Sequence, residues 1–275
     1  MEASDIQSRL IQSLETIYSA DEIKAIARWV SDELPADKIK TESWLNEVIN
    51  RLKTHEPFQY ILGYTWFYNR KIKVSPSTLI PRPETEEMCW HILQRRRKFH
   101  SIADVCTGSG CIATTLACEV PGARIIASDI SAEALQTALE NIQQYSLNER
   151  VECLQTDFLN DPYPEEKFDL IVSNPPYVGH EEACEMEKNV LDWEPHIALF
   201  PAGMDDIIFY RRLCGLLQLQ LAGTELWAEI NPQRASALLE LFSGLGVATI
   251  IPDSSGKDRF LHVTRHTAPA ESGTD

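Results

Sequence analysis

The sequence predicts an α/β fold, in which a small N-terminal helical domain precedes a mostly parallel, seven-stranded sheet. Residues 1–57 place apolar side chains at helical spacing, whereas from about residue 85 short apolar runs alternate with longer helical patterns. This alternation is typical of a parallel sheet, because each crossover between parallel strands needs a helix. The apolar run 168–173 then stops at the two prolines of Asn174-Pro175-Pro176-Tyr177, as expected where a buried parallel strand ends.

The N-terminal region, residues 1–57, is predicted to be a helical bundle. Ile6, Leu10 and Leu14 recur at the spacing that lines one face of a helix, and Pro35 interrupts a later pattern. The apolar faces of the helices are therefore expected to pack against each other.

A linker is predicted at residues 58–84, where the pattern changes. Asn69-Arg70 is expected to turn a short hairpin. Pro76, Pro81 and Pro83 stiffen the extended segment that follows, so the linker is expected to be structured.

Residues 85–267 are predicted to form the sheet domain. Its strands are expected at 101–105, 124–128, 150–155, 168–173, 224–230, 247–251 and 259–265. Its helices are expected at 85–97, 111–119, 131–145, 203–221 and 233–243. The loop between the last two strands is too short for a helical crossover, so the last strand is predicted to be antiparallel. Residues 268–275 are small and polar, and we expect a disordered tail.

The composition limits the classes of function. A formal net charge of −16 argues against a protein that holds nucleic acid mainly through its phosphates. No segment approaches the run of about 20 apolar residues that spans a bilayer, and the acidic N-terminus is unlike a secretory signal. Seven cysteines without a C-x-x-C pair indicate reduced thiols rather than a zinc site. We therefore expect a cytoplasmic monomer with no metal, no membrane contact and no direct nucleic-acid partner.

A glycine-rich turn follows the first predicted strand of the sheet. In Cys106-Thr107-Gly108-Ser109-Gly110 the glycines let the backbone approach a ligand closely. Asp129 ends the next strand, roughly 20 residues further on, where a ribose hydroxyl needs a carboxylate. Asp157 ends the third strand and precedes Phe158, and this pair is predicted to hold an adenine by its amine and its face. Turn or helix capping is the alternative role for both aspartates.

These residues suit two ligands, a nicotinamide dinucleotide and S-adenosylmethionine. A dinucleotide enzyme needs a second ribose-phosphate site and a hydride partner, and the sequence after Asp157 contains no obvious candidate for either. Methyl transfer fits better, because it needs a nitrogen lone pair that is aimed at a sulfonium methyl group.

The tetrapeptide Asn174-Pro175-Pro176-Tyr177 is predicted to bind the acceptor and to carry the catalysis. The oxygens of the Asn174 side chain and the Pro175 carbonyl lie at the carboxyl end of a strand, where ligands bind in open α/β sheets. Together they can accept both hydrogens of a planar NH2 group, and Tyr177 is available to stack on its plane. Such positioning lowers the barrier by fixing the geometry of the nucleophile. The alternative is an ordinary strand-ending turn, since Asn-Pro is common turn chemistry.

With these motifs the chain resembles the bacterial protein-(glutamine-N5) methyltransferases of peptide release factors. The segments that carry the resemblance are 57–63, 79–86, 104–110 and 173–177, with further matches around Glu194-Pro195 and Gly203-Met204. The similarity runs from Pro57 to near the end, whereas the earlier residues match only in helical character. The segment Arg82-Pro83-Glu84-Thr85 is the most specific, because a sister enzyme that methylates a ribosomal protein differs there.

The resemblance implies a class I S-adenosylmethionine-dependent methyltransferase fold, with S-adenosylhomocysteine as the product of the cofactor. It implies that Gly108, Gly110, Asp129, Phe158 and Asn174 contact S-adenosylmethionine. It also implies that residues 174–177 hold a glutamine of the release factor, within its Gly-Gly-Gln motif, and that the N-terminal helices help to bind that loop.

The chain departs from the family at one position of the glycine turn. The family usually has glycine where this chain has Cys106, so the departure is expected to affect cofactor affinity or the shape of the turn. Phe158 stands where some members have tryptophan, which preserves stacking.

Three other functions stay open on the sequence alone. The tetrapeptide also serves adenine-amino methyltransferases of nucleic acid, although these usually carry basic surface around the pocket. Methylation of a glutamine in a ribosomal protein is the second. The third is a non-catalytic scaffold that keeps only the shape of the cofactor site. Titration with S-adenosylmethionine distinguishes it from an enzyme, because a scaffold need not bind the cofactor.

The net charge of −16 leads to a prediction about association. Release factors approach ribosomal RNA, so parts of their surfaces are basic, and an acidic enzyme is steered towards such surfaces. The association rate, measured by stopped flow, should then fall steeply with added salt. A rate independent of salt would mean that the charge serves only solubility.

Overall fold

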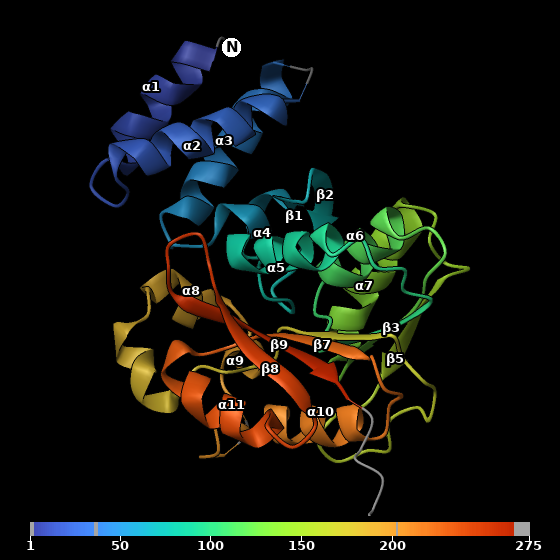
Figure 1. Ribbon diagram of the computed structural model, residues 1–275. Coiled ribbons are helices and arrows are strands. Elements are labelled where there is room, and N and C mark those ends of the chain that lie inside the picture. Colours follow the sequence, from blue (N-terminus) through green and yellow to red (C-terminus); the bar gives the residue numbers. More distant parts are fainter. Residues whose placement is uncertain (1–2, 36–37, 202, 267–275) are drawn as a thin grey trace, which may run out of the picture. The chain divides into compact units, whose positions relative to one another are not determined.

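The computed structural model describes residues 3–35, 38–201 and 203–266 (Figure 1). The chain divides into two compact units, Met1–Gly63 with Glu187–Trp193, and Tyr64–Met186 with Glu194–Asp275. The tail predicted at 268–275 lies outside the described residues. None of the helices in the described part is long and apolar enough to cross a membrane.

The first unit is helical, and its core is the one that the sequence predicts. Its helices are α1 (Ala3–Leu14), α2 (Ala20–Asp32), α3 (Lys38–Leu52), α4 (Phe58–Leu62) and α8 (Lys188–Trp193). Ile6, Leu10 and Leu14 are fully buried in this core. Helix α8 comes from far along the chain, and the Trp193 indole nitrogen donates to the Thr54 carbonyl oxygen at 3.2 Å.

The second unit contains the seven-stranded sheet, in the order β5-β4-β3-β6-β7-β9-β8. Its strands are β3 (Ser101–Val105), β4 (Arg124–Asp129), β5 (Val151–Gln155), β6 (Leu170–Ser173), β7 (Glu225–Glu229), β8 (Gly246–Pro252) and β9 (Asp258–Arg265). Strands β3 to β7 run parallel, and β9 is antiparallel to both of its neighbours. The predicted fold class, including the antiparallel last strand, is confirmed.

Helices cover both faces of the sheet and enclose two hydrophobic cores (Figure 1). The helices of this unit that connect the strands are α5 (Pro83–Gln94), α6 (Cys111–Glu119), α7 (Ala132–Gln144), α10 (Ile208–Gln218) and α11 (Ala235–Phe242). Helices α5, α6 and α7 share one core with Ile102 of β3, whereas α10 and α11 share the other with Ala103. Neighbouring residues of one strand enter opposite cores because successive side chains of a strand point to opposite faces.

The structure differs from the sequence-based predictions in four places, the first being helix α4 (Phe58–Leu62) within the predicted linker. The hairpin β1 (Tyr64–Phe67) and β2 (Arg70–Lys73) turns at Tyr68-Asn69, one residue earlier than predicted, and both turn residues have positive φ. The helix predicted from 203 begins only at Ile208, after Gly203 with φ 86°. Short helices that were not predicted occupy part of 180–199: η1 (His180–Glu185), α8 and α9 (His196–Leu199).

Strand β7 begins at a buried carboxylate, Glu225, that is held by four side chains. Arg95 and Arg97 each approach it at 2.9 Å, and nitrogens of His262 and Trp227 lie at 3.1 and 3.2 Å. Burial alone would raise the pKa of Glu225. The hydrogen bonds of His262, Trp227 and Arg97 and the charge of Arg95 outweigh burial and lower that pKa to about 2.

Replacing this carboxylate by an amide is expected to destabilise the fold in a pH-dependent way. Glu225→Gln should lower the free energy of unfolding by about 2 kcal/mol at neutral pH, the scale of a lost hydrogen bond to a charged group. Because the folded pKa lies below the ordinary value, the stabilisation is present above about pH 4.5 and is lost as the pH falls towards 2.

Urea unfolding of both proteins should therefore show a stability difference that narrows between about pH 6 and about pH 3. Glu240→Gln, at an exposed position of α11, is the matched control and should change little. A difference that stays constant over this pH range would contradict the role given to Glu225.

Candidate active site

The parallel register brings four strand ends to one edge of the sheet. Val105 of β3 is paired with Ser128 of β4 and with Ser173 of β6, and Ser173 is paired with Ala228 of β7. The residues that directly follow on the chain are Cys106, Asp129, Asn174 and Glu229. Three of these four are residues that the sequence predicts to be functional, and they belong to neighbouring strands.

The glycine turn adopts a backbone that L-residues rarely enter. Cys106, Gly108 and Gly110 have φ of 61°, 55° and 73°. A Cβ atom at Gly110 would lie 3.0 Å from Cβ of Ala138 on helix α7, so the close approach requires glycine there. Cys106 makes the same kind of turn with a side chain, at a cost of about 1–2 kcal/mol. The departure noted at this position is therefore tolerated in the folded turn, with backbone strain.

Two carboxylates, Asp104 and Asp129, accept hydrogen bonds from groups of the glycine turn and of helix α6. Asp104 is buried, and its Oδ2 accepts hydrogen bonds from the Thr107 hydroxyl (2.6 Å) and the Ala113 amide (3.0 Å). Burial raises the pKa of Asp104 to about 7, although these hydrogen bonds oppose the shift. Oδ2 of Asp129 accepts from the Gly108 amide at 2.9 Å, and burial raises the pKa of this carboxyl too.

The turn fits a ligand that brings hydrogen-bond donors and positive charge. Among the described residues, Oδ1 of Asp104 is a buried oxygen without a hydrogen-bond partner. A buried polar atom without a partner destabilises the free protein, so a donor from a ligand is favourable there. Near the turn and elsewhere in the described residues, no three His, Cys, Asp or Glu side chains are placed to hold a metal ion.

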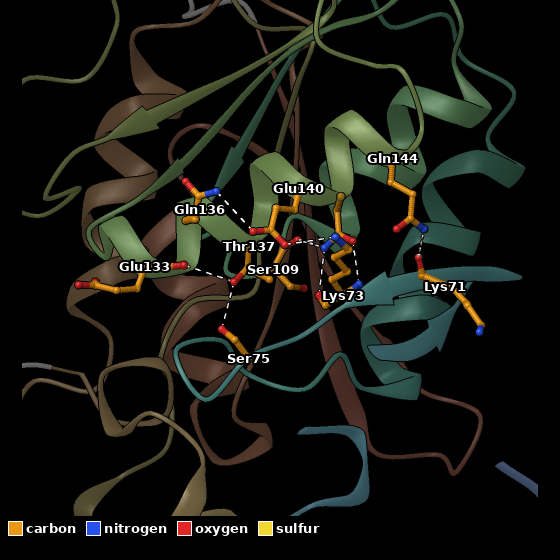
Figure 2. Close-up of polar contacts among 10 residues, drawn as sticks. Lys71, Lys73, Ser75, Ser109, Glu133, Gln136, Thr137, Glu140 and Gln144 are labelled. Carbon is orange, nitrogen blue, oxygen red and sulfur yellow. Dashed lines mark hydrogen bonds and ion pairs between the residues drawn. The ribbon is translucent and has the colours of Figure 1, made fainter. Parts of the chain in front are cut away.

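Helix α7 fastens the glycine turn to the hairpin (Figure 2). Asn141 is fully buried, and its Nδ2 donates to the carbonyl oxygens of Lys73 (3.0 Å) and Ser109 (2.8 Å). Its Oδ1 accepts from the Lys73 amide at 2.7 Å. Ser75 and Thr137 share a hydroxyl hydrogen bond of 3.0 Å close by. The end of the hairpin and the glycine turn are therefore held by one side chain.

The residues predicted to hold an adenine lie at a turn after β5. Asp157 accepts from the Leu159 amide (3.0 Å) and the Asn160 side chain (2.8 Å), so it caps this turn. Phe158 is buried, with its ring edge-on to Tyr163 at a centroid distance of 5.3 Å. The capping role is present in the structure, and the adenine-binding role of the pair stays a prediction.

The tetrapeptide is held by a network of side chains after β6. Ser173 donates to the Val105 carbonyl oxygen at 2.7 Å, which ties β6 to β3 at this point. Pro175 and Pro176 are buried, whereas Asn174 and Tyr177 are half-buried. Nδ2 of Asn174 donates to the Thr85 hydroxyl at 3.0 Å, and the Tyr177 hydroxyl donates to Oε1 of Glu229 at 3.0 Å.

Two members of this network were missed as site residues. The Thr85 hydroxyl donates to Oε2 of Glu229 at 2.6 Å, so these two side chains link Asn174 to Tyr177. Thr85 lies in the most family-specific segment, and Glu229 ends an apolar strand as Asp129 does. Position at a strand end was therefore the signal that could have found Glu229. Burial raises the pKa of Glu229, against the hydrogen bonds from Thr85 and Tyr177.

A partly buried ion pair anchors the segment that carries Thr85. Glu194 is buried, and it accepts from Arg82 at 2.6 Å and from the Ile80 amide at 3.1 Å. Helix α5 then begins at Pro83, with Thr85 in its first turn. The resemblance segments around 82 and 194 are thus in direct contact.

Comparison with known proteins gives consistent matches. The model of the methyltransferase small domain family matches residues 86–194. A release factor glutamine methyltransferase from Bacteroides thetaiotaomicron is 38% identical over 94% of this chain and 99% of the relative. One from Koribacter versatilis is 43% identical over 95% of this chain and 93% of the relative. Among solved structures, a methyltransferase from Pyrococcus furiosus superposes with a TM-score of 0.52 at 16% identity, covering 73% of this chain and 91% of that chain, which shows the shared fold.

The strain at Cys106 is expected to reverse the usual order of two substitutions. In the interior of a helix or strand, a protein with alanine is more stable to unfolding than one with glycine, by about 0.5–1 kcal/mol. At φ 61° glycine avoids the steric cost that alanine keeps. Cys106→Gly should therefore be more stable than Cys106→Ala, by about 1 kcal/mol in urea unfolding. An alanine variant as stable as the glycine variant would show that the turn is not strained.

Proposed function

Because the chain belongs to the release factor glutamine methyltransferases, we propose that it methylates the side-chain amide nitrogen of a glutamine in peptide chain release factors. S-adenosylmethionine is the methyl donor: the sulfur–methyl bond breaks as the nitrogen–methyl bond forms, and the nitrogen then loses a proton, so that the products are S-adenosylhomocysteine, N5-methylglutamine and a proton. The observation that carries the proposal is the Asn174 amide at the end of β6, whose nitrogen is bound by Thr85 and whose oxygen is left to accept a donor.

The acceptor nitrogen needs help because an amide lone pair is delocalised. Oδ1 of Asn174 and the carbonyl oxygen of Pro175 accept the two N–H bonds of the glutamine NH2 group, which raises electron density on nitrogen and fixes its plane. Tyr177 is tied to Glu229 and flanks the acceptor. Positioning and hydrogen bonding of this kind supply the catalysis, without a strong base that acts before the transfer.

The cofactor is assigned to the glycine turn and the strand ends beside it. When bound there, S-adenosylmethionine supplies an electrophilic methyl group. We assign its binding to residues of the turn and of the adjacent strand ends: Cys106, Thr107, Gly108, Ser109, Gly110, Asp129, Asp157, Phe158 and Asn174. The carboxylates at this edge suit a positively charged ligand, because a cation offsets the cost of their burial.

The acceptor glutamine is proposed to be that of the Gly-Gly-Gln motif, held by residues 174–177. Discrimination of one glutamine requires contacts beyond the acceptor pocket, and we assign some of these to the N-terminal helices, residues 1–57, and to the linker 58–84. The enzyme is proposed to act in the cytoplasm as a monomer, on protein rather than nucleic acid.

A methyl-transfer assay tests this function. The purified protein is mixed with S-adenosylmethionine labelled in its methyl group and with a bacterial release factor, or with the factor whose Gly-Gly-Gln glutamine is replaced by alanine. Label should enter only the unaltered factor. Label in neither factor, with cofactor binding intact, would refute the acceptor, and nucleic acid and ribosomal protein would be tested next.

Loss of the Asn174 amide should reduce the chemical step. Asn174→Ala is expected to lower kcat by about 10²-fold or more, the effect of removing one positioned transition-state contact. Asn148→Ala, at an exposed turn position, is the matched control and should keep wild-type turnover. Near wild-type kcat in Asn174→Ala, measured in the same assay, would refute the mechanism.

A further inference from the structure

We propose that Thr85 and Glu229 are positioning residues that set the orientation of the Asn174 amide for catalysis. This inference rests on the proposed function, because it concerns how the acceptor-binding oxygen of Asn174 comes to face the substrate. Neither residue needs to touch the substrate for this role.

The three side chains form an unbroken hydrogen-bonded chain across three elements. Asn174, after β6, donates through Nδ2 to the Thr85 hydroxyl at 3.0 Å. Thr85, in the first turn of α5, donates to Oε2 of Glu229 at 2.6 Å. Thr85 is 2% exposed and Glu229 1% exposed, so water does not compete for these bonds. The Thr85 and Glu229 part of this hydrogen-bonded row is therefore shielded from solvent.

The donor-to-acceptor direction of these hydrogen bonds determines which way the Asn174 amide points. In the structure the Thr85 hydroxyl donates to Oε2 of Glu229, so the single hydrogen of that hydroxyl is committed to the carboxyl group. The Thr85 oxygen then presents a lone pair to Asn174 and requires a donor there. The NH2 group of Asn174 meets that requirement, whereas a flipped amide would place two acceptor oxygens against each other. Oδ1 is consequently turned away from Thr85, and the hydrogen bonds of the described residues give it no protein donor.

Glu229 also holds the second functional side chain of the tetrapeptide. Its Oε1 accepts from the Tyr177 hydroxyl at 3.0 Å, while its backbone carbonyl accepts from the buried Tyr210 hydroxyl at 2.7 Å. One carboxylate thus orients both Asn174 and Tyr177. A movement of Glu229 would disturb the acceptor and the ring beside it together.

The other glutamate of β7 shows what a purely structural carboxylate looks like in this protein. Glu225 is held by two arginines, a histidine and a tryptophan. The hydrogen-bond partners of Glu229 are instead two hydroxyl groups, and burial raises its pKa although these bonds and the charge of Arg259 oppose the shift. The burial of Glu229 disfavours its charged form, and its hydroxyl partners connect it to the tetrapeptide. Both observations fit a role in orienting Asn174 and Tyr177.

Thr85 gives the sharpest test, because valine matches its shape and serine keeps its hydroxyl. Thr85→Val should lower kcat on the release factor at least about 10-fold with little change in the affinity for S-adenosylmethionine, measured by calorimetry. Thr85→Ser should restore most of the lost kcat. Glu229→Gln should lose less than Thr85→Val, because the glutamine oxygen still accepts from Thr85. Glu225→Gln is the control, with lower stability and unchanged kcat in the folded enzyme.

A double-mutant cycle with Asn174 separates positioning from general damage. If Thr85 acts through Asn174, then adding Thr85→Val to Asn174→Ala should cause no further loss of kcat. Multiplied losses in the double variant would overturn the inference, as would a Thr85→Val enzyme within twofold of wild type. A wild-type enzyme that fails to label the release factor would refute the proposed function itself, and the inference would fall with it.

Discussion

The site depends on the shared register of the parallel strands β4, β3, β6 and β7. Because these strands end at the same level, the residues that follow them are neighbours although they are far apart along the chain. Two prolines stop β6 at this level and prevent Asn174 from being absorbed into a longer strand. The hydrogen bond from Ser173 to the Val105 carbonyl oxygen then locks the end of β6 beside the glycine turn. The residues proposed to bind acceptor and cofactor are thus brought together by backbone pairing.

This edge of the sheet concentrates carboxylates whose burial opposes their charge. Burial raises the pKa values of Asp104, Asp129 and Glu229, and each carboxylate is held by amide or hydroxyl donors. At the opposite end of β7, Glu225 has cationic partners and a pKa lowered to about 2. Glu225 is thus stabilised as an ion within the fold, whereas burial disfavours the charged form of the three carboxylates at the candidate site. A cationic ligand near the glycine turn would recover part of the free energy that their burial costs.

The sequence predicted the sheet well because its strands are apolar runs bounded by breakers. It placed Asp129 and Asn174 at strand ends for the same reason, since they directly follow such runs, and their functional roles stay predictions. Glu229 also directly follows an apolar run. Its proposed role, however, depends on its contact with Thr85, which lies 144 positions away in the sequence. No local pattern reports such a contact.

Other errors have equally physical causes. The hairpin turned one residue early because Tyr68 adopts positive φ, which its side chain does not favour. The short helices in 180–199 have too few residues for a periodic pattern to be recognised. Helix α8 belongs to the first unit through contacts such as that of Trp193 with Thr54, which proximity along the chain does not reveal.

The hairpin of the predicted linker is fastened to the sheet unit, because Asn141 binds it to the glycine turn. The same buried amide binds both backbone groups of Lys73 and the carbonyl oxygen of Ser109. A displacement of the hairpin would leave buried donors and acceptors without partners, and this costs more than the hydrogen bonds themselves contribute. Strand β2 therefore helps to hold the glycine turn in its shape. These bonds are consistent with the division of the chain, in which the hairpin belongs to the same compact unit as the sheet.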